Sequence, residues 1–177
     1  ANAAAFGEYI AGGAKGYRDA VIITLGTGIG SGIILNGKIL RGFNFAAGEM
    51  GHNVIVKDGI QCTCGRKGCW ERYASASALT ARPRRPMQEN KNTIMWQMTQ
   101  DIDHVNAKLA FDAAAKGDET AQKVVDSWIE YVASALPMSS TSRVAMPFAG
   151  VWWYQCIRTM GWALFLISSA LCRYECL

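Results

Sequence analysis

Three cysteines and one histidine lie close together in the sequence and are of the types that bind zinc. They are His52, Cys62, Cys64 and Cys69. Three thiolates and one imidazole complete a tetrahedral zinc site with no coordination position left for water. Such a site can order a glycine-rich loop that has little hydrophobic core of its own. The alternative is that these cysteines are simply buried or paired in disulfides, and the spacing favours zinc over it.

A second candidate site is the segment 26–32, in which every other residue is glycine. Glycines so placed allow positive φ and close approach, so backbone N–H groups can converge on an anion. The segment is not a Walker A loop, because no Gly-Lys-Ser or Gly-Lys-Thr follows. The dinucleotide fingerprint also fails, because Ser31 stands where it requires glycine. A tight structural hairpin is the alternative, but a strand–glycine–strand hairpin carrying Thr27 resembles the phosphate-holding element of actin-like ATPases.

Two carboxylates, Glu49 and Glu71, flank the cysteine cluster in the sequence. A zinc fold that gathers His52 and Cys69 is expected to bring these carboxylates near one another. Converging acceptors suit a polyol, whose hydroxyl groups are donors fixed in space. Taken without the cluster, the two residues would be interpreted as ordinary surface charges.

The elements expected to position these groups form an α/β domain with antiparallel hairpins. A helix is expected within residues 1–16, ending near Gly12, and a buried strand at 21–25. A second strand at 33–35 leads into Asn36-Gly37, a strong type I′ turn signal, and a returning strand at 38–40. Segment 42–69 has the composition of a loop held by something other than a large core.

Helices are expected to follow the cysteine cluster, at 70–79 and 105–116. Gly117 lies where a C-cap glycine would, and Asp118 is expected to cap a further helix. The apolar face of that last helix is predicted to contain Val124, Val125, Trp128, Ile129 and Val132. Segment 80–103 has no clear pattern.

Composition and charge exclude several other classes of protein. The net charge of +4 comes partly from the run Arg82-Pro83-Arg84-Arg85, which lacks the interleaved aromatics of a nucleic-acid stripe and is interpreted as a solvated loop. The start of the chain lacks the pattern of a signal peptide. The apolar segment 161–171 is about half the length of a membrane span. A cytoplasmic protein without membrane or nucleic-acid partners is expected.

The motifs together resemble the ROK family of sugar kinases and sugar-responsive repressors. The resemblance lies in Gly48-Glu49-Met50-Gly51-His52 and Cys62-x-Cys64-Gly65-x-x-Gly68-Cys69-x-Glu71. The run through Cys69-Trp70-Glu71-Arg72-Tyr73 is similar to the glucokinase branch, and segment 25–30 to the family's second phosphate loop. The resemblance covers residues 1 to about 135. It implies part of an actin-like ATPase (ribonuclease-H-like) fold with a zinc-stabilised loop.

The resemblance also implies a role for each site residue. His52, Cys62, Cys64 and Cys69 would bind structural zinc, while Glu49, His52 and Glu71 would bind the hydroxyl groups of a hexose. Gly26, Thr27, Gly28 and Gly30 would contact the phosphates of ATP. With Mg²⁺, the whole protein would transfer the γ-phosphoryl group to the sugar 6-hydroxyl. A homodimer is the expected assembly.

The chain departs from the family pattern at both ends. The family's general-base Asp would precede Ala1, and the first phosphate loop, Asp-x-Gly-Gly-Thr, does not occur, so we expect no catalysis by these 177 residues alone. Residues 136–177 are off-pattern, and a reading-frame slip is one hypothesis. Because tryptophan has a single codon, Trp152-Trp153-Tyr154 read one base later encodes the Gly-Gly of an expected turn.

Two alternatives to a glucokinase remain at this point. One is the sugar-sensing domain of a repressor, which an upstream helix-turn-helix would distinguish. The other is a kinase for N-acetylmannosamine, N-acetylglucosamine or fructose, with ATP or polyphosphate as donor. A zinc-stapled structural domain would leave Glu49, Glu71 and the glycine-rich segment unexplained.

Overall fold

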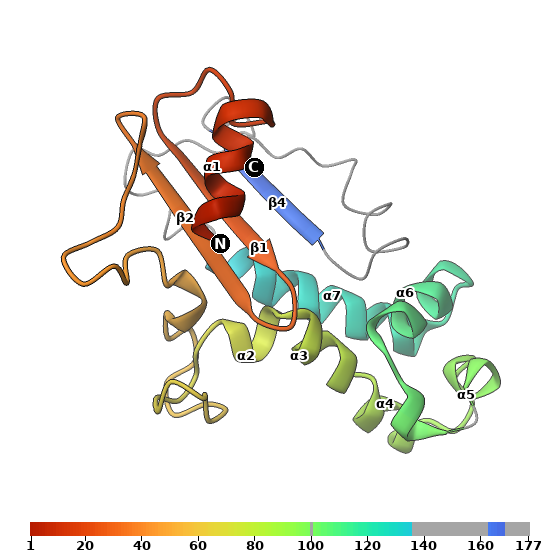
Figure 1. Cartoon of the computed structure of the whole chain (residues 1–177). Coiled ribbons are helices and arrows are strands. Elements are labelled where there is room, and N and C mark those ends of the chain that lie inside the picture. The colour runs from red at the N-terminus through yellow and green to blue at the C-terminus, as the bar shows by residue number, and fades with distance from the viewer. Residues whose placement is uncertain (100, 136–162, 169–177) are drawn as a thin grey trace, which may run out of the picture.

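An antiparallel sheet holds the glycine-rich segment in place (Figure 1). The computed structural model describes residues 1–99 and 101–135, and the backbone of 163–168. The sheet has the order β3-β2-β1-β4, with every neighbouring pair antiparallel. Its strands are β1 (Ala20–Leu25), β2 (Ile29–Leu35), β3 (Lys38–Ile39) and β4 (Ala163–Ser168).

Strand β1 is buried on both faces, as its unbroken apolar sequence predicts. Ala20 and Ile22 pack with Ala5 of helix α1 (Asn2–Ala11), which covers one face of the sheet. Val21, Ile23 and Leu25 alternate with them and point into the main core on the other side. Helices α2 (Glu71–Ala74), α3 (Ala76–Ala81) and α7 (Glu119–Ser134) supply that core (Figure 1).

The β2–β3 turn confirms the hairpin prediction. Asn36 and Gly37 have φ values of 51° and 74°, the paired positive angles that a type I′ turn requires. Strand β2, however, begins at Ile29 instead of residue 33, so Gly30 and Gly32 belong to a strand. The glycine-rich turn itself contains only residues 26–28.

The predicted helix at 70–79 is two helices, because Ser75 interrupts it. The Ser75 backbone is extended (φ −70°, ψ 164°), and its hydroxyl accepts a hydrogen bond from the N–H of Ala78. Ser75 therefore ends α2 and caps α3, which turns the chain just after the cysteine cluster.

The remaining helices lie beyond this turn: α4 (Arg84–Glu89), α5 (Met95–Met98) and α6 (Ala107–Ala115), with 3₁₀ turns η1 (Met50–His52) and η2 (Ile102–His104). Helix α6 begins two residues later than predicted, because Asn106 caps it through Leu109 N–H. Gly117 adopts φ 86° after it, as expected of a C-cap glycine. The prediction for Ile129 is wrong: its side chain is 43% exposed, while the other four predicted positions on α7 are buried.

The prediction of a solvated loop at 82–85 is wrong for Arg82 and Pro83 and for the loop at 84–85, whereas Arg84 and Arg85 are exposed as expected. Arg84 begins α4, Pro83 is buried, and the Arg82 guanidinium donates to the Tyr73 carbonyl and to Ser127 Oγ. No helix among the described residues is long and apolar enough to cross a membrane. The reading-frame hypothesis concerns residues 136–177, which lie outside the described residues apart from the β4 backbone. The same holds for the apolar segment 161–171.

Asp118 joins two helical segments, and its removal should be costly. Its carboxylate caps α7 through Ala121 N–H (2.7 Å) and accepts from Ile94 N–H (2.7 Å) and the Thr93 hydroxyl (2.8 Å). Burial alone would raise its pKa, but these hydrogen bonds outweigh burial and hold the pKa of Asp118 below its usual value. We expect Asp118→Ala to lower the free energy of unfolding by about 3 kcal/mol.

Denaturant unfolding checks this, with Asp112→Ala as the control because Asp112 only pairs with Lys108 on the surface of α6. A depressed pKa in the folded state means that the Asp118 contribution is present above the unfolded value of about 3.9 and is lost as the pH falls through the folded value. The difference in free energy of unfolding between wild type and Asp118→Asn should therefore become smaller as the pH is lowered. Equal losses of unfolding free energy in Asp118→Ala and Asp112→Ala would contradict the role of Asp118 in joining the two segments.

Candidate functional site

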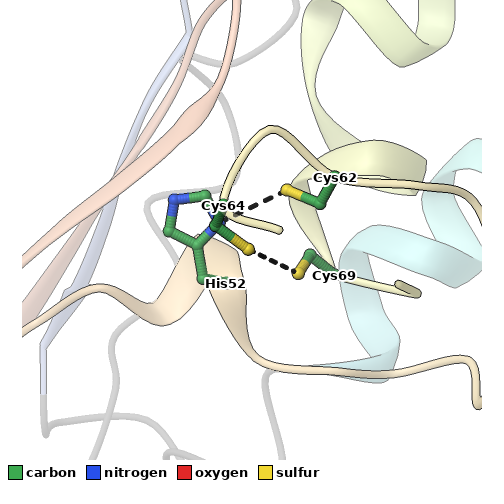
Figure 2. A group of neighbouring side chains, drawn as sticks. All are labelled: His52, Cys62, Cys64 and Cys69. Carbon is green, nitrogen blue, oxygen red and sulfur yellow. Dashed lines mark hydrogen bonds between the residues drawn. The ribbon is translucent and has the colours of Figure 1, made fainter. Parts of the chain in front are cut away.

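The four predicted metal ligands converge on one point (Figure 2). One ligand atom from each of His52, Cys62, Cys64 and Cys69 lies within 4.8 Å of all the others. Cys62 Sγ is 3.6 Å from His52 Nδ1, and Cys64 Sγ is 3.5 Å from Cys69 Sγ. All three cysteines are free, whereas the disulfide alternative predicted that they would be paired. Three sulfurs and one nitrogen at this spacing fit a tetrahedral zinc ion.

The cysteines lie on a small hairpin that the backbone closes. Gln61 and Lys67 form an isolated bridge, and Cys62 N–H donates to the Arg66 carbonyl at 2.8 Å. A second bridge, Val54 to Cys69, returns the chain to the segment that carries His52. The Arg66 guanidinium also donates to the His52 carbonyl at 2.9 Å. Loop and histidine are therefore held together by hydrogen bonds with no large core.

Two of the thiols differ strongly in acidity. The backbone N–H of Arg66 lowers the pKa of the exposed Cys64 thiol to about 6. Burial raises the pKa of Cys69 to about 12. The Cys64 thiol therefore loses its proton more readily than the Cys69 thiol, whose deprotonation a bound cation would favour.

Trp70 fastens this loop to the main core. Its side chain is fully buried and its indole N–H donates to the Tyr131 carbonyl on α7 at 2.7 Å. Its backbone N–H donates to the Asn53 carbonyl at 2.8 Å. Trp70 thus connects the cysteine loop both to α7 and to the segment that follows His52. The sequence analysis gave Trp70 no such role.

The segment containing Glu49 and His52 packs directly on strand β2. The Ser31 hydroxyl donates to the Gly48 carbonyl and accepts from Met50 N–H (3.3 Å). Gly51 lies so close to the Ile29 carbonyl that a Cβ would collide with it. Glu49 itself is exposed and begins the turn η1. Ser31 was missed by the sequence analysis, although a serine between glycines in a buried strand is a signal for such a contact.

Glu71 reaches the same strand from the other side. Its carboxylate accepts a hydrogen bond from Ile29 N–H at 2.9 Å, next to Gly28. A Cβ on Gly28 would collide with this carboxylate. Ile29 is therefore contacted by both Glu71 and Gly51, which links the glycine-rich turn with the segment leading to His52.

The glycines of the turn and of β2 allow close packing. An added Cβ would collide with Glu71 at Gly28, with Thr24 and Ala1 at Gly30, and with Ala5 at Gly32. Gly26, Gly28, Gly30 and Gly32 all lack the left-handed φ that the sequence analysis allowed for. Thr27 is exposed at the turn. The contact of these residues with phosphate remains a prediction.

Known proteins are similar to this chain in sequence and in fold. The ROK family model matches residues 1–142. A glucokinase of Halalkalibacterium halodurans is 41% identical over 140 residues, which is 77% of this chain and 42% of the relative. A xylose repressor of Bacillus spizizenii is 40% identical over 106 residues, covering 60% of this chain and 27% of the repressor.

A solved structure agrees in both fold and sequence. The ROK glucokinase of Streptomyces griseus, crystallised with glucose and AMPPNP, superposes with a TM-score of 0.74 and 35% identity over 80% of this chain and 46% of that one. The fold and the Cys/His cluster thus define an α/β protein related to the sugar kinases of the actin-like ATPase class. The chain belongs to the ROK family, and it spans less than half the length of the glucokinase from Halalkalibacterium halodurans.

Proposed function

We propose that this chain is the zinc- and sugar-binding part of an ATP-dependent hexose kinase whose substrate is glucose. The observation that supports it is the convergence on Ile29. Glu71 and the segment ending at His52 meet there, beside the turn that contains Thr27 and Gly28. A sugar held by Glu49, His52 and Glu71 would therefore lie next to a loop able to receive ATP phosphates.

Zinc has a structural role in this proposal. The four ligands leave no open position for substrate, so the ion would order the loop and fix the tautomer and orientation of the His52 ring. His52 uses Nδ1 toward Cys62, which leaves Nε2 to hydrogen-bond a sugar hydroxyl. Mg²⁺ would enter with ATP and neutralise charge on the phosphates.

Phosphoryl transfer itself is proposed for the whole protein. No residue among the 177 corresponds to the family's general-base Asp or to its first phosphate loop. Binding without turnover is therefore the expected behaviour of this chain alone, in the cytoplasm of its host. The whole protein is expected to be a homodimer.

The repressor alternative is supported by the similarity to a xylose repressor. A sugar sensor needs the hydroxyl-binding carboxylates but not a phosphate loop. Binding of AMPPNP that is weakened by substitution of Thr27 would favour the kinase, while sugar binding with no nucleotide binding would favour the repressor.

Sugar binding by Glu71 gives the most direct test. Saturation-transfer NMR should detect weak glucose binding by the zinc-loaded chain, and Glu71→Gln should weaken it about tenfold, because a charged acceptor of sugar hydroxyls is lost. Glu130→Gln, which removes an exposed carboxylate from α7, is the matched control. The proposal fails if glucose binds equally well to both variants. Repeating the titration with N-acetylmannosamine, N-acetylglucosamine and fructose tests the identity of the sugar.

A further inference from the structure

A concave pocket lies between helices α2, α3, α4 and α7, on a part of the molecule that the proposed kinase site does not use. Its volume is about 590 Å³, within the range of small-molecule sites. Three arginines line it, Arg72, Arg82 and Arg85, together with the serines Ser75 and Ser77 and the tyrosines Tyr73 and Tyr131.

The pocket is strongly cationic. Three of its lining residues are arginines, and none is an aspartate or glutamate. The Arg72 guanidinium has no hydrogen-bond or ion-pair partner among the described residues, so no carboxylate there compensates its charge. Arg85 pairs through Nε with Glu89 at 2.7 Å, which leaves its two terminal nitrogens free to donate.

Arg82 forms the fixed wall of the pocket. Its guanidinium lies 4.8 Å from the centre of the Tyr131 ring and donates to Ser127 Oγ and the Tyr73 carbonyl. Its Nε is buried and has no partner among the described residues. Burial of this arginine without a carboxylate partner is unfavourable, and an anion in the pocket would offset that cost.

We propose that this pocket binds a phosphate group carried by a small molecule. Arg72 and Arg85 would donate directly to the phosphate oxygens, the geometry that guanidinium groups favour. The Ser77 hydroxyl is a further donor, and Arg82 adds a fixed positive charge behind them. The stacked rings of Tyr73 and Tyr131, 5.0 Å apart, give an apolar wall for the rest of the ligand.

The shape and distribution of charge favour a small anion over a nucleic acid. A nucleic-acid surface extends the positive charge along a face of several elements. Here the neighbouring Arg84 turns away to pair with Asp103, at 3.9 Å, and does not line the pocket. The charge is therefore concentrated in one cavity.

The proposal can be tested by titrating the chain calorimetrically with inorganic phosphate and with glucose 6-phosphate, a phosphomonoester. Arg72→Ala and Arg85→Ala should each weaken binding about tenfold or more, because each removes charged hydrogen bonds. Arg84→Ala is the matched control, since it removes an equal charge from a neighbouring position outside the pocket, and its affinity should stay within about twofold of wild type. Circular dichroism of all variants checks that they fold.

The two anions distinguish the form of the ligand. Tighter binding of glucose 6-phosphate than of inorganic phosphate, if it is lost in Arg72→Ala, indicates that the pocket also contacts the rest of the ligand. Equal, arginine-dependent binding of the two indicates that the phosphate group alone is recognised, and either result supports the site. No binding to wild type at millimolar concentrations, or binding that survives the double substitution Arg72→Ala/Arg85→Ala, would overturn it. Inorganic phosphate has no sugar hydroxyl groups, so its titration tests this pocket independently of the glucose titration that tests Glu71, and the two proposals can fail separately.

Discussion

The purified chain should contain about one zinc ion, and Cys69→Ser should lose it together with the folded loop at residues 48–69. Structural zinc sites contribute apparent binding free energies of about 10–16 kcal/mol, as large as the whole stability of a typical domain, about 5–15 kcal/mol. The loop depends on this contribution because only a few of its residues are buried, among them Cys62 and Cys69. Elemental analysis and thermal unfolding measure the two effects.

Cys69 is the most informative of the ligands to replace. It is fully buried and precedes Trp70, which anchors the loop in the main core. Burial also raises the pKa of its thiol to about 12, so that only a bound cation would make it a thiolate at neutral pH. A serine there offers a hydroxyl that zinc does not readily deprotonate.

A histidine outside the cluster provides the control. The His104 side chain is 81% exposed and pairs only with Asp101 among the described residues, so His104→Asn should leave both zinc content and unfolding temperature unchanged. Chelation of wild type should reproduce the Cys69→Ser phenotype, and added zinc should restore the folded loop in wild type alone. A Cys69→Ser chain that keeps one zinc ion and its unfolding temperature would contradict the assigned metal site.

The Cys/His cluster and the hairpin could be predicted because each depends on local chemistry. Ligand type and spacing are sufficient to predict a Cys/His cluster, and the structure brings His52 together with the three cysteines. Asn36-Gly37 predicts its own turn, because few other residue pairs adopt two positive φ angles. Asp118 and Gly117 likewise predicted the adjoining helix ends from short-range hydrogen bonding and backbone freedom.

The remaining features depend on contacts between distant segments. The role of the glycines of the turn and of β2 is to admit Glu71 and helix α1, which come from other parts of the chain. Arg82 resembled a surface residue because its partners, Ser127 and Tyr131, lie about fifty residues further along. Ile129 fitted the helical period but lies at the edge of the buried face of α7, where packing decides exposure.

Gly68→Ala should disrupt the cysteine loop far more than Gly65→Ala, although both glycines have positive φ. Their φ angles are 79° and 89°, so alanine at either position is strained by about 1–2 kcal/mol. A Cβ at Gly65 meets no atom within 4 Å, whereas one at Gly68 would collide with the Val56 carbonyl. The Gly68 carbonyl also accepts from Ile55 N–H (2.9 Å) and Val56 N–H (3.3 Å), and these hydrogen bonds position the segment leading into Cys69.

The backbone at Gly68 therefore cannot move to relieve the collision without displacing the neighbouring Cys69 from the cluster. We expect Gly65→Ala to retain about one zinc ion and lose only the strain energy, while Gly68→Ala loses most of its zinc. Elemental analysis and denaturant unfolding of the two variants, purified in parallel, measure the contrast. Both variants carry the same backbone strain. Any additional loss of zinc or of stability in Gly68→Ala therefore measures the packing of the loop on Val56. Equal zinc content and stability in the two variants would show that this packing does not hold Cys69 in place.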